Sequence, residues 1–168
     1  MRKPSAAVVL LTFGIFIVML GPSLAAGQAT QPAGKLVLFA DLNAFGPGSD
    51  PNSCTLRNRY KKGETVGFRV YAVDGASAKP EVSAQVVVHV NFGGKTYDLP
   101  ALYRGIPQKT PNGGTMPVHE GMWTAKWIVP ADAPTGTVDI SATAKDKYGR
   151  AAEWKPNGGE PSFLTIVP

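Results

Sequence analysis

The stretch ETVGFRVYAV, residues 64–73, decides the predicted fold. Its apolar side chains alternate with the others, so one face of an extended chain carries Val66, Phe68, Val70 and Ala72. A two-residue period built from β-branched and aromatic residues is typical of a half-buried β-strand. We therefore predict a strand here, with one face in a hydrophobic core.

Similar segments lie on both sides of this strand. We predict further strands at residues 35–40, 82–92, 95–99, 120–129, 137–145 and 162–167. Gly93-Gly94 separates two alternating runs, which indicates a hairpin with a two-residue turn. Turns rich in glycine and proline bound the other strands, and residues 104–119 are predicted to form a long loop. The predicted fold is all-β: an antiparallel β-sandwich of about seven strands, formed by residues 35–168.

One stretch carries a resemblance. Residues 122–150 read MWTAKWIVPADAPTGTVDISATAKDKYGR, which is an aromatic strand, a Pro-Thr-Gly turn, an alternating strand and then Asp-x-x-Gly. Together with the strand end at residues 70–74, this order resembles bacterial immunoglobulin-like domains. The resemblance implies an immunoglobulin-like β-sandwich in an exported protein, and it brings no catalytic residues. Because Cys54 is the only cysteine, no internal disulfide can join the sheets.

The first residues have the layout of a secretory signal. Arg2 and Lys3 precede an uncharged apolar run at residues 6–20, and small residues follow around Ala25. We predict a signal peptide at residues 1–25, a linker at 26–34, and a periplasmic or extracellular location. The alternative is an uncleaved membrane anchor, because residues 5–26 approach the roughly 20 residues that a spanning helix needs.

The charge distribution argues against nucleic-acid binding. The densest basic cluster in the predicted mature chain comprises Arg57, Arg59, Lys61 and Lys62. A nucleic-acid surface needs basic residues gathered on one face with aromatic residues among them. We expect these side chains to be solvated, with the steering of an acidic protein partner as the alternative.

Sequence motifs indicate no enzyme. The chain has only two histidines, no Gly-x-Ser-x-Gly elbow and no phosphate-binding glycine loop. No Ser/His/Asp set is evident, and His89 is expected on the surface of a strand. We therefore predict no catalytic residues.

A group of soft metal ligands makes copper binding an alternative function. Met116, His119 and Met122 are spaced three residues apart, and thioether plus imidazole suits Cu(I). The favoured interpretation is a loop that leads into a strand, with Met122 packed in the core and no cofactor. Cys54 is expected to be an inert thiol, a further copper ligand or a partner in an intermolecular bond.

The favoured function is protein binding. We expect an exported, non-enzymatic accessory or structural subunit that binds another exported protein, or a further copy of itself, through its loops. The candidate surfaces are the loop at 104–120, the loop around Cys54 and the segment around Trp154. Partner contacts are expected from Arg57, Arg59, Arg104, Tyr148 and Trp154. The alternatives are a periplasmic copper carrier and a carbohydrate-binding module that uses exposed aromatic residues.

Overall fold

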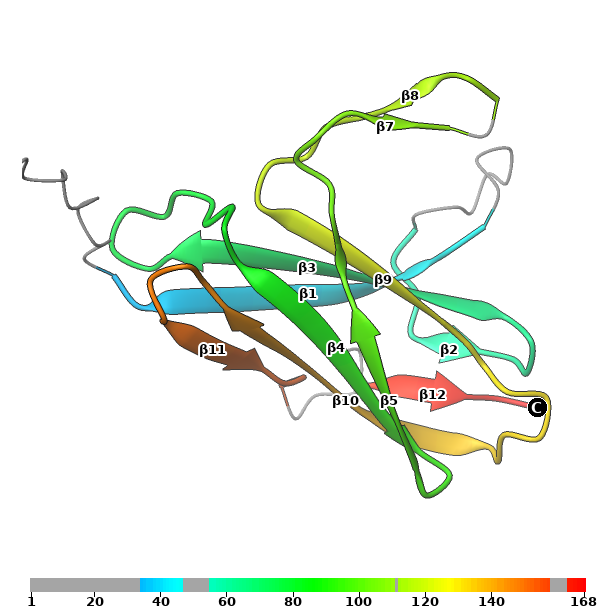
Figure 1. The fold of residues 1–168 in the computed structure, drawn as a ribbon. Helices are drawn as coiled ribbons and strands as arrows, with labels where there is room; N and C mark the ends of the chain where they lie inside the picture. Colours follow the sequence, from blue (N-terminus) through cyan, green and yellow to red (C-terminus); the bar gives the residue numbers. More distant parts are fainter. Residues whose placement is uncertain (1–33, 47–54, 111, 158–162) are drawn as a thin grey trace, which may run out of the picture. The chain divides into compact units, whose positions relative to one another are not determined.

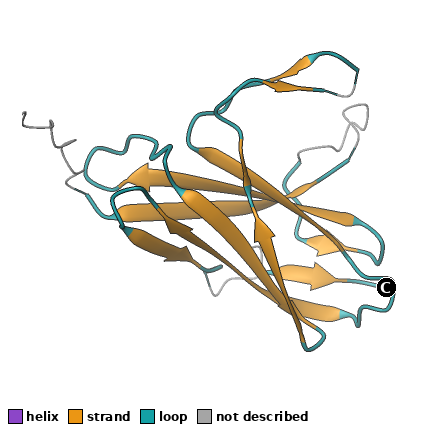
Figure 2. Ribbon diagram, viewed as in Figure 1, coloured by secondary structure: helices purple, strands orange, loops and turns teal. Residues whose placement is uncertain are grey.

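The structure is a computed structural model that describes residues 34–46, 55–110, 112–157 and 163–168. The chain divides into two units, residues 1–30 and 31–168, and every described residue belongs to the second. The predicted signal peptide at 1–25, nearly all of the linker at 26–34, and Cys54 lie outside the described residues. All regular structure that is described is β-strand (Figure 2). A search of the same residues finds no helix long and apolar enough to span a membrane.

Four strands form the first sheet, in the order β1-β3-β9-β6, and all neighbours are antiparallel (Figure 1). The strands are β1 (Leu36–Ala44), β3 (Thr65–Asp74), β9 (Met122–Ile128) and β6 (Leu102–Tyr103). Leu36 pairs with Asp74, and Tyr71 pairs with Met122. The end of β3 therefore lies beside the beginnings of β1 and β9.

The second sheet is built around β10 (Gly136–Lys145). Its order is β2-β12-β10-β4-β5, and β11 also pairs with β10. The remaining bounds are β2 (Arg59–Tyr60), β4 (Gln85–Phe92), β5 (Lys95–Pro100), β11 (Ala151–Trp154) and β12 (Leu164–Ile166). Strands β12 and β11 pair with the same edge of β10. β12 pairs with residues 136–138 and β11 with residues 142–145. β2 runs parallel to β12. Outside these sheets, β7 (Gln108–Lys109) and β8 (Thr115–Met116) form a small hairpin.

The inner faces of the two larger sheets share one hydrophobic core. The predicted faces of three strands are confirmed, because all of the following are buried: Val66, Phe68, Val70, Ala72, Val86, Val88, Val90, Val138, Ile140, Ala142 and Ala144. Trp123 and Trp127 are buried as expected. The Trp127 ring of the first sheet contacts Phe92 and Tyr97 of the second, with ring centroids 6.1 and 5.6 Å apart. Each fully buried large apolar side chain stabilises the fold by about 1.5–3 kcal/mol.

The all-β prediction is confirmed, and so is the Gly93-Gly94 hairpin. Gly93 and Gly94 have φ of 60° and 74°, and they connect the paired residues Phe92 and Lys95. A two-residue turn of this kind needs left-handed backbone at both positions, which glycine adopts without steric cost.

Several predicted boundaries differ from the structure. The first strand continues to Ala44 rather than ending at residue 40, because its register with β3 extends to Val66. The predicted loop at 104–119 contains the β7–β8 hairpin. The sequence predicts no strand at residues 151–154, but these residues form β11, so Trp154 lies on a strand. Elements of two to four residues are too short to show a periodicity.

Three connecting segments meet where β3 ends. They are residues 75–84, the described residues of 104–121 and the turn at 146–150, and we call this region the Asp74 end. Gly121 lies against the β3–β4 connection so closely that an added Cβ would be 2.7 Å from the Cβ of Pro80. Strand β1 also starts here, since Leu36 pairs with Asp74 and the Gly34 amide donates to Asp74 Oδ2 at 3.1 Å.

This contact predicts the outcome of two alanine substitutions. Gly121 and Gly63 have φ of 71° and 79°, but only Gly121 has a neighbour where a Cβ would be. Gly63→Ala should therefore lower the free energy of unfolding by about 1–2 kcal/mol, from left-handed backbone strain alone. Gly121→Ala should cost roughly 1–3 kcal/mol more, because the new Cβ overpacks against Pro80. Urea unfolding measures both, and equal losses would contradict the contact between the two segments.

Candidate interaction surface at the Asp74 end

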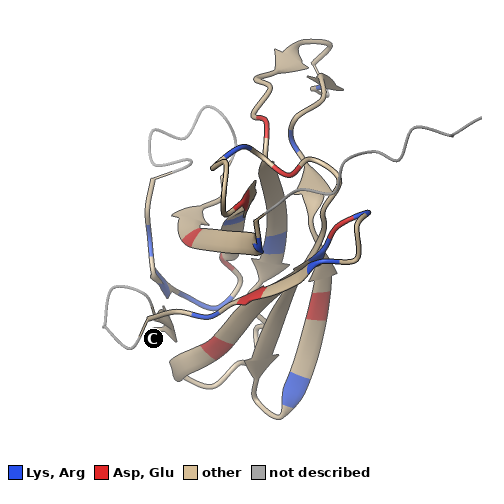
Figure 3. Ribbon diagram, turned by 90° about the vertical axis from the view of Figure 1, so that its left-hand side faces the viewer, with Lys and Arg blue, Asp and Glu red and all other residues tan. Residues whose placement is uncertain are grey.

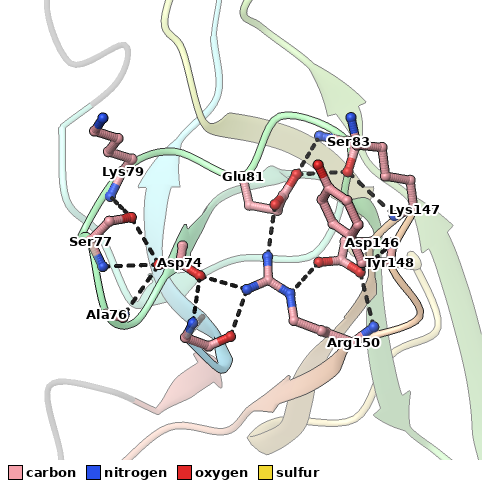
Figure 4. Close-up of polar contacts among 11 residues, drawn as sticks. Asp74, Ala76, Ser77, Lys79, Glu81, Ser83, Asp146, Lys147, Tyr148 and Arg150 are labelled. Atoms are coloured by element: carbon pink, nitrogen blue, oxygen red, sulfur yellow. Dashed lines mark hydrogen bonds and ion pairs between the residues drawn. The ribbon is translucent and has the colours of Figure 1, made fainter. Parts of the chain in front are cut away.

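Arg150 joins three carboxylates at the Asp74 end (Figure 4). Its guanidinium contacts Asp74 at 2.6 Å, Glu81 at 2.7 Å and Asp146 at 2.6 Å. The Arg150 side chain is 11% exposed, and those of its three partners are 9%, 9% and 0% exposed. We call these four residues the Arg150 cluster.

Local turns hold each carboxylate in place. Asp74 ends β3, and its Oδ1 accepts hydrogen bonds from the amides of Ala76 and Ser77 and from the Ser77 hydroxyl. Asp residues favour such turns because their short side chains bond to the backbone two or three residues on. Asp146 does the same in the DKYGR turn, where its Oδ1 accepts from the amides of Tyr148 and Arg150.

Glu81 is held by Ser83. Its Oε1 accepts from the Ser83 amide at 3.1 Å and from the Ser83 hydroxyl at 2.6 Å, which leaves Oε2 for Arg150. Arg150 also donates to the backbone carbonyl of Gly34 at 2.6 Å. The cluster therefore fixes the first described residue, the β3–β4 segment and the β10–β11 turn to one another.

These contacts shift the pKa values of the acids downward. Hydrogen bonds from the Ser77 amide and hydroxyl, and then from Arg150, lower the pKa of Asp74 well below its usual range. For Asp146, burial acts to raise the pKa, but the hydrogen bonds from Arg150 and Tyr148 outweigh burial and lower it. Both carboxylates are therefore ionised at neutral pH.

An apolar surface lies beside this cluster, on the outer face of the four-stranded sheet. Phe39 pairs with Tyr71, and Val37 pairs with Val73. The Phe39 side chain is 51% exposed, and the other three residues are half-buried. We call these residues the Phe39 patch. The ion pair between Arg69 Nε and Asp41 Oδ1, at 2.7 Å, lies next to it.

The β7–β8 hairpin stands away from the two larger sheets (Figure 1). Its base is anchored by Arg104, whose amide donates to the Met122 carbonyl at 2.8 Å and whose carbonyl accepts from the His119 amide at 2.9 Å. Ile106 and Val118, one on each side of this base, have exposed side chains. The hairpin thus presents apolar groups next to the sheet on which it is anchored.

The structure gives the three proposed copper ligands different surroundings. Met116 Sδ accepts a hydrogen bond from Arg104 Nη2 at 3.3 Å, Met122 is buried at the start of β9, and His119 is exposed. The described residues hold no group of three or more His, Cys, Asp or Glu side chains that could bind a metal ion. Thr55, the neighbour of Cys54, bonds to Ala44 at the end of β1 remote from Asp74.

Four of the five predicted partner-binding residues fall into two groups. Arg104 and Tyr148 lie at the Asp74 end, where Tyr148 is half-buried under the cation of Lys147. Arg57 and Trp154 lie together, around a cavity of about 340 Å³. The cavity is also lined by Ala40, Asp41, Leu42, Leu56 and Asn58. Arg59 is exposed on β2.

Basic and acidic residues are interspersed over the described ribbon in the view of Figure 3. Arg57 pairs with Glu64, Arg69 with Asp41 and Lys155 with Glu153. Charge at the surface is therefore compensated locally in these places.

The Arg150 cluster predicts a large stability difference between two ion-pair variants. Arg150→Met leaves three buried carboxylates without their cation, and should lower the melting temperature by about 10 °C. The control is Lys155→Met, which removes an ion pair whose side chains are 65% and 52% exposed. An exposed pair contributes little, so the control should change the melting temperature by less than about 3 °C. Similar shifts for both variants in thermal unfolding would contradict the structural role of Arg150.

The lowered pKa values predict acid sensitivity. Asp74 and Asp146 are harder to protonate in the folded state than in the unfolded state, where an Asp has a pKa of about 3.9. Their contribution to stability is therefore fully present above about pH 5 and is lost as the pH falls from about 4 to 2. Urea unfolding across this range should show a steep loss in the wild type and a shallower one in Arg150→Met. Parallel curves would contradict the proposed pairing.

No family model and no curated protein matches this chain. One solved structure that is similar is a DUF4466 family protein from Parabacteroides merdae, with a TM-score of 0.38 and 18% sequence identity. The match covers 76% of this chain and 44% of that one, so this chain spans less than half of the other's length.

Proposed function

We propose that this chain is an exported immunoglobulin-like module that binds another exported protein through its Asp74 end. Support for the fold comes from the strand order. In immunoglobulin constant domains one sheet has the order A-B-E-D, and the other contains C, F and G. Here β1-β3-β9-β6 corresponds to A-B-E-D, and β5-β4-β10 followed by β11 and β12 corresponds to C′-C-F-G.

This correspondence bears on the choice of surface. In antibody variable domains the B–C and F–G loops lie at the end of the sandwich that binds antigen. The corresponding segments here are residues 75–84 and 146–150, which the Arg150 cluster holds together.

The single observation that carries the proposal is the gathering of exposed apolar side chains at this end. Eight large hydrophobic side chains are exposed among the described residues, and five of them are at or next to the Asp74 end. The five are Phe39, Val82, Leu102, Ile106 and Val118. We infer that exposed apolar side chains concentrated toward one end of a rigid frame form its surface for protein contact.

The predicted export depends on the sequence alone, because residues 1–25 lie outside the described part of the chain. The proposal therefore includes a periplasmic or extracellular location. Fractionation of cells that express the full chain, followed by N-terminal sequencing, would examine this part separately. A mature protein that begins near residue 26 is expected, and retention of the whole chain in the cytoplasm would contradict export.

A photo-crosslinking experiment tests the binding surface. The full chain would be expressed in its native host with benzoylphenylalanine at position 39 or 106, or at the control position 128. Ile128 is 61% exposed, but it pairs with Thr65, at the end of β3 remote from Asp74. We expect adducts with one exported protein from positions 39 and 106 but not from 128.

Two outcomes would contradict the proposal. One is a chain without adducts at any position, and the other is equal adducts at positions 39 and 128. An adduct of twice the chain mass would show that the partner is a second copy of this chain. Whether the partner is a different protein or a second copy, Phe39→Asp should reduce the yield of the crosslinked adduct from position 106 about tenfold or more. The reason is that the substitution places a charge in an apolar contact.

A further inference from the structure

The outer face of the six-stranded sheet carries three side chains in a line. His89 on β4 lies between Asp98 on β5 and Thr143 on β10. His89 Nδ1 is 2.7 Å from Asp98 Oδ1, and His89 Nε2 is 2.8 Å from Thr143 Oγ1. No sequence motif predicts this set, because the three residues come from three strands and His89 and Thr143 are 54 positions apart.

The chemistry of the groups assigns the protons. An ionised carboxylate only accepts hydrogen bonds, so Nδ1 must carry the hydrogen that is shared with Asp98. In the neutral imidazole Nε2 then has a free electron pair, and it accepts the hydroxyl hydrogen of Thr143. A hydroxyl bonded to an imidazole that is oriented by a carboxylate is the arrangement that activates a nucleophile.

Thr143 also faces open space in which a substrate could lie. It lines a groove of about 700 Å³ that runs along β4, β10 and β11. Gln85, Lys145 and Glu153 line the same groove. Lys145 is two residues from Thr143 on the same strand and pairs with Gln85. Residues two apart on a strand face the same side, so Lys145 and Gln85 lie on the same outer face of the sheet as Thr143.

We propose that Thr143 is the nucleophile of a site that hydrolyses small acyl esters, with His89 as the general base. Thr143 Oγ1 forms a bond to the ester carbonyl carbon while its proton moves to His89 Nε2. The bond to the leaving alkoxide then breaks, and the alkoxide takes the proton from His89. Water releases the acyl group from Thr143 by the same proton path, which regenerates the free hydroxyl. The proposal assigns stabilisation of the oxyanion to Lys145 and Gln85, which line the same groove as Thr143.

Asp98 acts through His89 and is a positioning residue. It holds the imidazole in the tautomer that accepts from Thr143, and stabilises the imidazolium that forms during the transfer. The alternative is a cross-strand hydrogen-bond network without reactivity. A hydrolytic site and an unreactive network differ in whether Thr143 reacts with an electrophile.

A fluorophosphonate probe and p-nitrophenyl acetate test the proposal on the full chain. We expect one phosphonyl adduct per chain by intact mass, mapped to Thr143 by peptide sequencing, and slow release of nitrophenol. Thr143→Val should abolish both. His89→Gln should reduce both rates at least about 100-fold, which is the lower range for a general base. Asp98→Asn should lower kcat with KM unchanged, and Asp98→Glu should restore part of the loss.

The matched control is Thr96→Val. Thr96 also makes a cross-strand hydrogen bond on this face, to Asn91 Oδ1 at 2.8 Å, but it is not bonded to His89. The Thr96→Val variant should label with the fluorophosphonate and hydrolyse p-nitrophenyl acetate as the wild type does. Absence of any adduct, an adduct that maps to a residue other than Thr143, or labelling that persists in Thr143→Val would overturn the proposal. Thermal unfolding of each variant separates loss of reactivity from loss of the fold.

Discussion

The contact between the Arg150 guanidinium and three carboxylates is the constraint on which the Asp74 end depends. Hydrophobic burial between the sheets holds the strands together, but it does not determine how the connecting segments lie. Arg150 does so by bonding to residues in two of these segments and to Gly34 at once. Burial makes this arrangement costly to break, because each carboxylate would lose its cation in a place where water cannot fully replace it.

The two outer faces of the molecule differ in character, and this difference separates the two proposals. The four-stranded sheet presents Phe39 and its apolar neighbours close to the connecting segments, which suits contact with another protein. The six-stranded sheet presents a polar ladder, in which His89 bonds to Asp98 and Thr143 while Asn91 bonds to Asp139. Binding at one face and reactivity at the other do not depend on each other.

The sequence predicted the strands well where they are long and packed on one side. Val66, Phe68, Val70 and Ala72 were placed on the buried face because their period of two has one physical cause, burial in a core. The sequence does not predict the short strands β2, β6 and β11, since two to four residues are too few to show a periodicity. The site was predicted less well. Arg104 and Tyr148 do lie at the Asp74 end, but the sequence does not predict the Arg150 cluster, because Asp74 and Glu81 are 76 and 69 positions from Arg150.

Amide hydrogen exchange on the wild type and on Arg150→Met tests the central claim most directly. If Arg150 fixes the Asp74 end, the variant should lose protection at residues 74–84 and 146–150 and keep it in the β4–β5 hairpin. Protection that is unchanged at these residues would contradict the account. So would a uniform loss through both sheets, because it would mean that Arg150 supports the whole fold rather than this end of it.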